Sequence, residues 1–441
     1  MSRSYLQLCL RQTKHLITQC QRETLPMSMQ LNCRNYFKAN SALIKPFLKN
    51  NIITTTFRWC PKQNFHTSSR HLIHPLIWVI IKPLAKFGAA ITGRTIRVWF
   101  KRLAPEERRK VWLKLRQFWY IPAGCSVALA GTCSYYYYSH LEETPITGRW
   151  RFIVFTHEQI IKIAEAEAEM LIEKFSGNFY NPTDLPYQRV AQVALKLLSA
   201  NPELKQMPFD SWKIFVVKDP LVNACVLPNG NIFVFDGILN MANTQDQLAV
   251  ILGHEMAHSV LGHGVEELSY GNIVDVFVII CLAALWLIIP FDGVAIVTHW
   301  FYNKVVKLLT HMPHSRQMER EADKVGLKFA AKACYDIREG SVLWQKMSYH
   351  EKLNAGNQEV LPEFMLTHPD SMKRAEHIDF MLPEAEKWRN GMKCPKLPTA
   401  DPREAIQILS KEIDNYLLAT KTGQDLRRVP QKPSLVIVRP S

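Results

Sequence analysis

The chain lacks the patterns that would link its positive charge to nucleic acid. Its net charge is +15 at pH 7, yet it has no zinc-finger spacing, recognition-helix pattern or aromatic RNA-binding motif. The charge is also uneven. Residues 1–117 hold 22 Lys and Arg against three acids, a net +19, which leaves −4 for the rest of the chain. We therefore expect no nucleic-acid partner and assign the positive charge to the N-terminal segment.

None of the ten cysteines belongs to a C-x-x-C pair, which removes the commonest cysteine signature of metal and redox sites. Four cysteines precede residue 61, and Cys125, Cys133 and Cys281 lie in apolar runs, where cysteine usually packs as a small apolar side chain. Cys225, Cys334 and Cys394 remain for the folded body. A Cys334–Cys394 disulfide stays open for an oxidising compartment, although free buried cysteine is the commoner case.

Acidic residues are also nearly absent from residues 1–70, which contain 11 Lys and Arg, one acid (Glu23), and many Ser, Thr, Asn and Gln. This composition is typical of a mitochondrial transit peptide. A secretory signal is disfavoured because no apolar run closely follows the first charges. The sequence therefore predicts a transit peptide over 1–70, processed near 66–70, and the alternative is a basic tail that targets nothing.

No charged residue occurs in residues 117–139, a stretch of 23 residues. About 20 apolar residues span a bilayer as a helix. Aromatic side chains lie at both ends of the stretch, as they do at membrane interfaces: Trp119, Tyr120 and Tyr135 to Tyr138. The sequence predicts a transmembrane helix over 117–139, and a buried core helix is the alternative.

The flanks of this span set its predicted orientation. The preceding segment is strongly basic, whereas Glu142 and Glu143 follow the span. The positive-inside rule then places residues 71–116 on the matrix side of the inner membrane and residues 140–420 in the intermembrane space. We expect 71–116 to be a basic, membrane-proximal segment on anionic lipid such as cardiolipin, with a loose linker as the alternative.

A second apolar run covers residues 276–291, between Asp275 and Asp292. At 16 residues it is short for a full span. The sequence predicts an apolar, membrane-associated hairpin over 274–301, and a buried core helix is again the alternative. The tail over 421–441 is basic and is expected to be loose.

Residues 140–420 predict a mainly α fold with a small β-sheet, an α+β class. Apolar residues at helical or alternating spacing predict helices over 157–175, 187–199, 244–261 and 315–333, and strands over 150–156, 213–217, 222–226 and 232–235. A Pro-Asn-Gly-Asn turn at 228–231 joins the last two strands in a hairpin.

The helix expected over 244–261 contains His254-Glu255-Met256-Ala257-His258. Side chains four residues apart share a helix face, so His254 and His258 can chelate one tetrahedral zinc. Glu255, one step round the helix, can take a proton from a zinc-activated water. The alternative is two core histidines with ordinary hydrogen bonds. It is disfavoured because burying these groups in an apolar helix without a partner is costly.

A catalytic zinc needs a third protein ligand and an open position. Glu319 and Asp323 share a face of the helix expected over 315–333. Glu319 can be the third ligand, and Asp323 can accept the N–H of a ligating histidine. The sequence predicts that Glu321 points elsewhere. Without the histidine motif, a solvated charged helix start would be the better interpretation.

The H-E-M-A-H motif and the later S-R-Q-M-E-R-E-A-D segment resemble the gluzincin peptidases, which include HtpX, BepA and the CAAX-processing prenyl protease. The resemblance implies a gluzincin zinc-peptidase core that holds one Zn²⁺ through His254, His258 and Glu319. A segment resembling the family's substrate-pairing edge strand implies backbone contacts to substrate by Asn223, Ala224, Cys225 and Val226. The T-H-P-D-S-M-K-R segment resembles a late H-P-x-x-x-x-R motif. It implies that His368 stabilises the oxyanion or occupies the open site, with Arg374 as its support and Asp323 behind a histidine ligand.

A presequence, one span and a T-G-R-W-R-F strand resemble the mitochondrial inner-membrane members of this family. That resemblance implies a stress-activated endopeptidase that cleaves inner-membrane proteins, among them a dynamin-like fusion GTPase, and also itself. Homo-oligomerisation stays open. A non-catalytic scaffold is disfavoured because Glu255 and Glu319 are present. A prenyl-CAAX-type processing protease is disfavoured because it would need several membrane spans.

Overall fold

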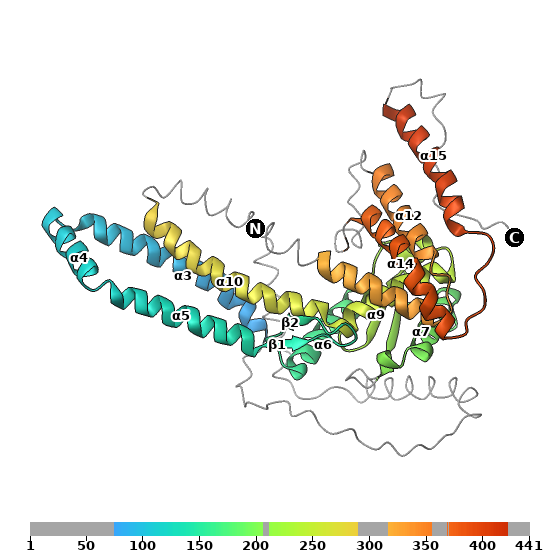
Figure 1. Cartoon of the computed structure of the whole chain (residues 1–441), viewed down its shortest axis with the longest axis horizontal. Helices are drawn as coiled ribbons and strands as arrows, with labels where there is room; N and C mark the ends of the chain where they lie inside the picture. Colours follow the sequence, from blue (N-terminus) through green and yellow to red (C-terminus); the bar gives the residue numbers. More distant parts are fainter. Residues whose placement is uncertain (1–74, 206–210, 290–315, 355–367, 369, 422–441) are drawn as a thin grey trace, which may run out of the picture. The chain divides into compact units, whose positions relative to one another are not determined.

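The computed structural model describes residues 75–205, 211–289, 316–354, 368 and 370–421. This part of the chain is mainly helical with two small sheets, which confirms the predicted α+β class (Figure 1). The predicted transit peptide over 1–70, the second limb of the predicted hairpin (290–301) and residues 422–441 of the basic tail lie outside the described residues.

The larger sheet has three strands in the order β3-β5-β4, namely β3 (Lys213–Val217), β5 (Asn231–Phe235) and β4 (Ala224–Val226). The predicted hairpin is confirmed, because β4 and β5 pair antiparallel through the turn where Gly230 takes a φ of 82°. β3 pairs parallel with β5 on the other side. Among the described residues, β4 has no second strand neighbour and so leaves one edge of the sheet free.

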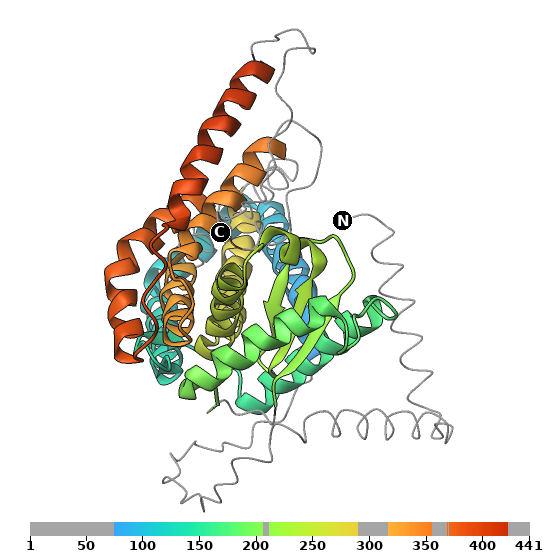
Figure 2. The same ribbon diagram turned by 90° about the vertical axis from the view of Figure 1, so that its right-hand side faces the viewer.

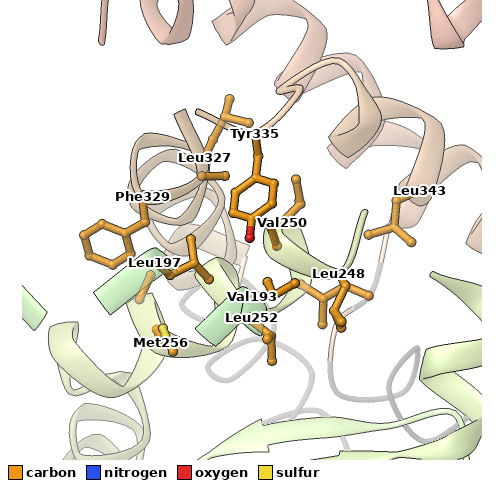
Figure 3. Close-up of a cluster of buried hydrophobic side chains, with 14 of the residues drawn as sticks. Val193, Leu197, Leu248, Val250, Leu252, Met256, Leu327, Phe329, Tyr335 and Leu343 are labelled. Carbon is orange, nitrogen blue, oxygen red and sulfur yellow. The ribbon is translucent and has the colours of Figure 1, made fainter. Parts of the chain in front are cut away.

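Two helices build the core around this sheet. α7 (Leu185–Ala200) packs against β3, and α9 (Gln245–Leu261) packs against β4 (Figure 2). Aliphatic side chains from both helices meet near Tyr335 in one buried cluster (Figure 3). α9 is buried along almost its whole length, so polar side chains on it are held in an apolar setting.

The ends of α9 are well defined. Thr244 is the N-cap, and its hydroxyl accepts a hydrogen bond from the Gln247 N–H at 3.1 Å. Gly262 ends the helix in a left-handed conformation with φ 66°. The chain then turns directly into α10 (His263–Ile288).

The basic segment before the predicted span is helical. It forms α3 (Pro75–Arg102) and α4 (Pro105–Gln117), so the loose-linker alternative is wrong. α3 lies side by side with α10 (Figure 1). Lys82 and Lys86 of α3 form ion pairs of 2.8 and 2.6 Å with Asp275 of α10.

The predicted transmembrane segment forms α5 (Tyr120–Ser139), which has no buried residue. Its role as a span stays a prediction. Cys125 and Cys133 on α5 are exposed, contrary to the expectation that they pack, because this helix has few neighbours. Within the described residues, α10 is the helix long and apolar enough to cross a membrane. Little of the apolar stretch of α10 is buried.

α10 also contains the first limb of the hairpin predicted from residue 274, and the hairpin itself stays a prediction. The helix begins at His263 and continues for 26 residues, because the charges that interrupt its apolar pattern have partners elsewhere. The remaining elements are β1 (Leu141–Glu143), β2 (Trp150–Phe152), α6 (His157–Lys174), η1 (Pro202–Lys205), α8 (Asp236–Met241), α12 (Glu339–Asn354), α14 (Ser371–Gly391), α15 (Pro402–Lys421) and an unlabelled helix over residues 316–332.

A disulfide joins Cys334, which follows the helix over 316–332, to Cys394, which follows α14. Their Cα atoms are 5.2 Å apart. Of the alternatives that the sequence leaves open, the structure has the paired state. Cys225 and Cys281 are not joined in a disulfide.

Candidate metal centre

Four side chains converge in a buried cluster next to the sheet: His254, His258, Glu319 and His368. Each offers one ligand atom, and all four atoms lie within 4.8 Å of one another. The Nε2 atoms of His254 and His258 are 3.0 Å apart, and each is 3.4 Å from an oxygen of Glu319. The structure thus brings together the three predicted ligands and the predicted neighbour His368.

A close approach of two helices creates this cluster. Gly253 of α9 faces Gly326 of the helix over 316–332, and a Cβ on Gly253 would come within 2.8 Å of the Gly326 carbonyl oxygen. Only glycine fits such a distance. The second helix can therefore place Glu319 and Asp323 directly beside the histidines of α9.

The donor set suits a divalent metal ion. Two imidazole nitrogens and one carboxylate oxygen are the protein ligands of a catalytic zinc, with a further position left for water. The cluster is also strongly buried, since His254 and Glu319 are only 1% and 6% exposed. A metal ion would give the converging imidazole and carboxylate lone pairs a common partner in this buried setting, where unpartnered polar atoms are costly.

Glu255 lies in the same site and has the features of a general base. Its Oε1 atom is buried and has no hydrogen-bond donor of suitable geometry among the described residues. The nearest basic atom is the Nε2 of His368, at 3.4 Å. Burial raises the pKa of the Glu255 carboxyl, against the opposing attraction of His368 and His254. An unpartnered buried carboxylate oxygen of this kind can accept a proton from a water in the site.

Asp323 and Arg374 lie directly behind the ligands. The Asp323 Oδ1 is 3.2 Å from the Nδ1 of His254, the ring atom turned away from the cluster. Arg374 donates to both oxygens of Asp323, at 2.9 and 2.5 Å, and forms a 2.8 Å ion pair with Glu319. Its guanidinium stacks 3.4 Å from the centre of the Trp344 ring. Arg374 therefore neutralises two acids and fixes their positions.

His368 lies at the edge of the cluster. Its Nδ1 is 2.9 Å from Glu319 Oε2 and 3.4 Å from His254 Nε2. This position suits either of the two roles expected for it, because the side chain is close enough to the ligands to join them or to face a bound substrate.

Comparison with known proteins agrees with this geometry. The model of peptidase family M48 matches residues 185–381, which include all four clustered residues. A mitochondrial metalloendopeptidase OMA1 from Danio rerio is 38% identical over 79% of this chain and 74% of its own length. The Homo sapiens protein of that name is 38% identical over 79% and 67%, and that of Schizosaccharomyces pombe is 33% identical over 68% and 80%.

The chain belongs to peptidase family M48. It is a metalloendopeptidase, and its similarity to mitochondrial relatives along most of its length makes it a mitochondrial one.

The cleft of this M48 peptidase has a volume of about 920 Å³ and runs past His258, Glu319 and His368. Its lining comes from α6, the start of α10, the start of the helix over 316–332 and the chain at the end of β4. Of the four predicted substrate-contacting residues, only Val226 lines the cleft, followed by Leu227 and Pro228, which the sequence did not single out. Ala224 is buried, and the side chain of Asn223 accepts a hydrogen bond from the Ala224 N–H at 2.9 Å. Cys225 is half-buried against aromatic side chains.

Two polar residues of this M48 peptidase also lie beside the metal centre without having been expected there. His263 is 2% exposed, and its Nδ1 is 2.9 Å from the Nδ1 of His258. Glu321 points away from the four clustered side chains, as predicted, and lies 3.3 Å from the Nε2 of His263. The only sequence signal was the presence of a third histidine five residues after His258.

Proposed function

We propose that this chain is a zinc-dependent endopeptidase of the mitochondrial inner membrane that hydrolyses peptide bonds of inner-membrane proteins. The observation that carries the proposal is the convergence of His254, His258 and Glu319, from two helices, on one point beside the unpartnered Glu255 Oε1. Imidazole and carboxylate ligands with an open position are typical of catalytic zinc.

Zinc, when bound, supplies Lewis-acid activation of water and of the peptide carbonyl. The side chains of the protein then carry out the proton transfers. Glu255 takes the proton of the attacking water at Oε1 and returns it to the leaving amine nitrogen. Glu255 follows His254 on α9 and is not among the four clustered candidate ligands, which leaves its carboxylate for proton transfer.

The free edge of β4 is the proposed binding site for the substrate backbone. A peptide that adds to this edge as a further strand gains main-chain hydrogen bonds that do not depend on its sequence. Val226, at the end of β4, lines the cleft together with His258, so a peptide paired with β4 runs toward the ligands. In this proposal the side chains of Asn223, Ala224 and Cys225 shape the strand rather than the cleft.

His368, which lines the cleft, and Arg374, which is buried behind the candidate ligands, are proposed to support the reaction. Arg374 keeps Asp323 and Glu319 ionised and in place. His368, 2.9 Å from Glu319, stabilises the developing oxyanion or occupies the open position when the enzyme is idle.

Membrane anchoring is part of the proposal. It is supported by the apolar α10, by the charge-free sequence of α5 and by the basic helices α3 and α4, which suit a surface of anionic lipid such as cardiolipin. The basic composition of residues 1–70 supports mitochondrial import, and the acidic residues after α5 support a peptidase domain that faces the intermembrane space.

The proposed substrates are inner-membrane proteins, among them a dynamin-like fusion GTPase and the enzyme itself, cleaved under stress. A non-catalytic scaffold is the competing proposal. The presence of Glu255, buried beside the candidate ligands with an oxygen that accepts no hydrogen bond from the described residues, argues against it.

The decisive experiment combines metal analysis with a cleavage assay on the full-length protein. The wild type should hold one zinc per chain and cleave a test protein. Glu255→Gln should keep zinc and fold but lose cleavage by at least about a hundredfold, whereas His258→Ala should lose zinc as well. Unchanged cleavage by Glu255→Gln, or a folded wild type without stoichiometric metal, would overturn the proposal.

A further inference from the structure

A second polar cluster lies behind His258, on the side away from the other ligands. Its members are His263, Glu321, Glu266 and Arg149. His263 and Glu266 are both 2% exposed. The four residues come from three separate parts of the chain, and Arg149 lies outside the region that matches the family.

The corner between α9 and α10 places His263 next to His258. Because Gly262 takes a left-handed conformation, α10 starts directly after α9 with its first side chain turned back toward the metal centre. The rings of His258 and His263 are 4.8 Å apart and nearly perpendicular.

The hydrogen-bond geometry fixes which ring atoms carry protons. His258 Nε2 faces His254 and Glu319, so this atom must be free of hydrogen to bind a metal. Its Nδ1 then carries the proton and donates to His263 Nδ1, at 2.9 Å. His263 must therefore carry its own proton on Nε2, which lies 3.3 Å from Glu321 Oε2 and can donate to it.

Arg149 holds the far end of this chain of hydrogen bonds. Its Nε donates to Glu321 at 2.7 Å, and its two terminal nitrogens donate to both oxygens of Glu266, at 2.7 and 2.6 Å. Such a two-pronged contact fixes orientation as well as charge. The Thr147 hydroxyl also donates to Glu321, and the Arg149 N–H donates to the Thr144 hydroxyl at 2.9 Å.

The two histidine ligands are thus supported differently. His254 contacts a carboxylate directly, through Asp323. The corresponding ring atom of His258, Nδ1, contacts a second imidazole that in turn contacts a carboxylate, so the orientation of His258 depends on where His263 and Glu321 are held. Groups that orient a metal-bound histidine typically change metal affinity by about 10–100-fold when they are removed.

We propose that His263 is a positioning residue for the metal ligand His258, and that the 144–149 turn holds it in place through Arg149 and Glu321. The metal centre then depends on a segment that precedes the M48 region. The inference rests on the proposed zinc function, since the readout is zinc binding.

The test is the affinity of the full-length protein for Zn²⁺, measured by competition with a chromogenic chelator. His263→Phe keeps the bulk but offers no acceptor, and we expect zinc affinity to fall about 10–100-fold. His263→Asn offers an acceptor oxygen near the position of Nδ1 and should restore part of the loss. His377→Phe, on α14, is the matched control and should leave the affinity unchanged.

Arg149→Met tests the link to the turn. Arg149→Met should also lower zinc affinity. The double variant with His263→Phe should bind zinc no more weakly than His263→Phe alone, because both substitutions act through the same contacts. Arg403→Met is the control, since Arg403 also bridges two carboxylates, Asp401 and Asp379, elsewhere.

The outcomes separate this inference from the proposed function. If the wild type binds no zinc, the proposed function fails. If the wild type binds zinc and His263→Phe binds it equally well, the positioning role is overturned. The role is also overturned if Asn restores nothing, or if Arg149→Met and Arg403→Met have the same effect. Far-ultraviolet circular dichroism of each variant identifies those that fail to fold, for which Glu321→Gln is the replacement.

Discussion

Gly326 lies against the backbone of His254 so closely that a Cβ on Gly326 would come within 2.7 Å of the His254 Cα. This contact sets the spacing between the helix that supplies the two histidines and the helix that supplies Glu319. The separation of the ligands therefore depends on two backbones that touch.

The first prediction follows from this contact. Gly326→Ala should push the two helices apart, lower the free energy of unfolding by about 1–3 kcal/mol and weaken zinc binding. Thermal unfolding of the detergent-solubilised protein and metal analysis measure the two effects. Gly391→Ala is the control, because nothing lies within 4 Å of its Cβ position. Equal zinc binding by the Gly326 and Gly391 variants would contradict the prediction.

Removal of the metal should affect stability as well as activity. A ligand that binds only the native state stabilises it, by about 2.7 kcal/mol at a concentration of a hundred times Kd. We expect a chelator to lower the Tm and abolish cleavage, and added Zn²⁺ to restore both. A chelated protein with an unchanged Tm that still cleaves would show that the cluster holds no functional metal.

Lys346 predicts a pH dependence of stability. Its ammonium is fully buried and donates to the Met241 carbonyl and the Asn243 side chain, both at 2.6 Å. Burial lowers the pKa of Lys346 to about 8, despite the opposing effect of Glu339, from an ordinary 10.5. Between these two values the unfolded chain binds more protons than the folded chain. The free energy of unfolding should therefore rise with pH in this window, by at most about 1.4 kcal/mol per unit.

The measurement is chemical unfolding at several pH values from 7.5 to 10.5, a range of about three units. Lys346→Met should remove this contribution to the slope. Lys373→Met, whose side chain is largely exposed, should keep it. If the free energy of unfolding changes with pH equally in Lys346→Met and the wild type, the pH dependence does not come from Lys346.

The Cys334–Cys394 disulfide should stabilise the native state, because it closes a loop of 60 residues in the unfolded chain. In the chain-entropy model a loop of this size is worth about 4 kcal/mol, and about 2–4 kcal/mol is typical. Cys334→Ser should lower stability by that order in non-reducing buffer. Cys133→Ser, at an exposed unpaired cysteine, should not. A reductant should bring the wild type down to the level of the Cys334 variant and leave that variant unchanged.

The elements nearest the metal were predictable from local patterns. α9 depends on interactions between residues that are close in the sequence. These are the Thr244 cap, the apolar residues after it and the four-residue spacing of His254 and His258. The β4–β5 hairpin is equally local, because an Asn-Gly turn lies between two apolar strands.

Features that depend on distant partners were not predictable. Asp275 interrupts the apolar pattern of α10, and the sequence does not show that Lys82 and Lys86 neutralise it from nearly 190 residues away. In the same way, the sequence suggests that Glu321 is a solvated charge, and only the structure shows Arg149 and His263 beside it. The parallel pairing of β3 with β5 also joins strands that no turn connects.

The edge of β4 that has no strand neighbour among the described residues is the proposed substrate site, and this proposal has a consequence for which proteins can be cut. Only a chain that is already extended over several residues can present its amide groups to that edge. In a helix or a paired strand these backbone groups are already hydrogen-bonded. In this proposal the enzyme selects a target by its local backbone conformation more than by its amino-acid sequence. A segment that stays folded is therefore not cleaved, and the cleavage rate follows how often that segment of the target unfolds locally.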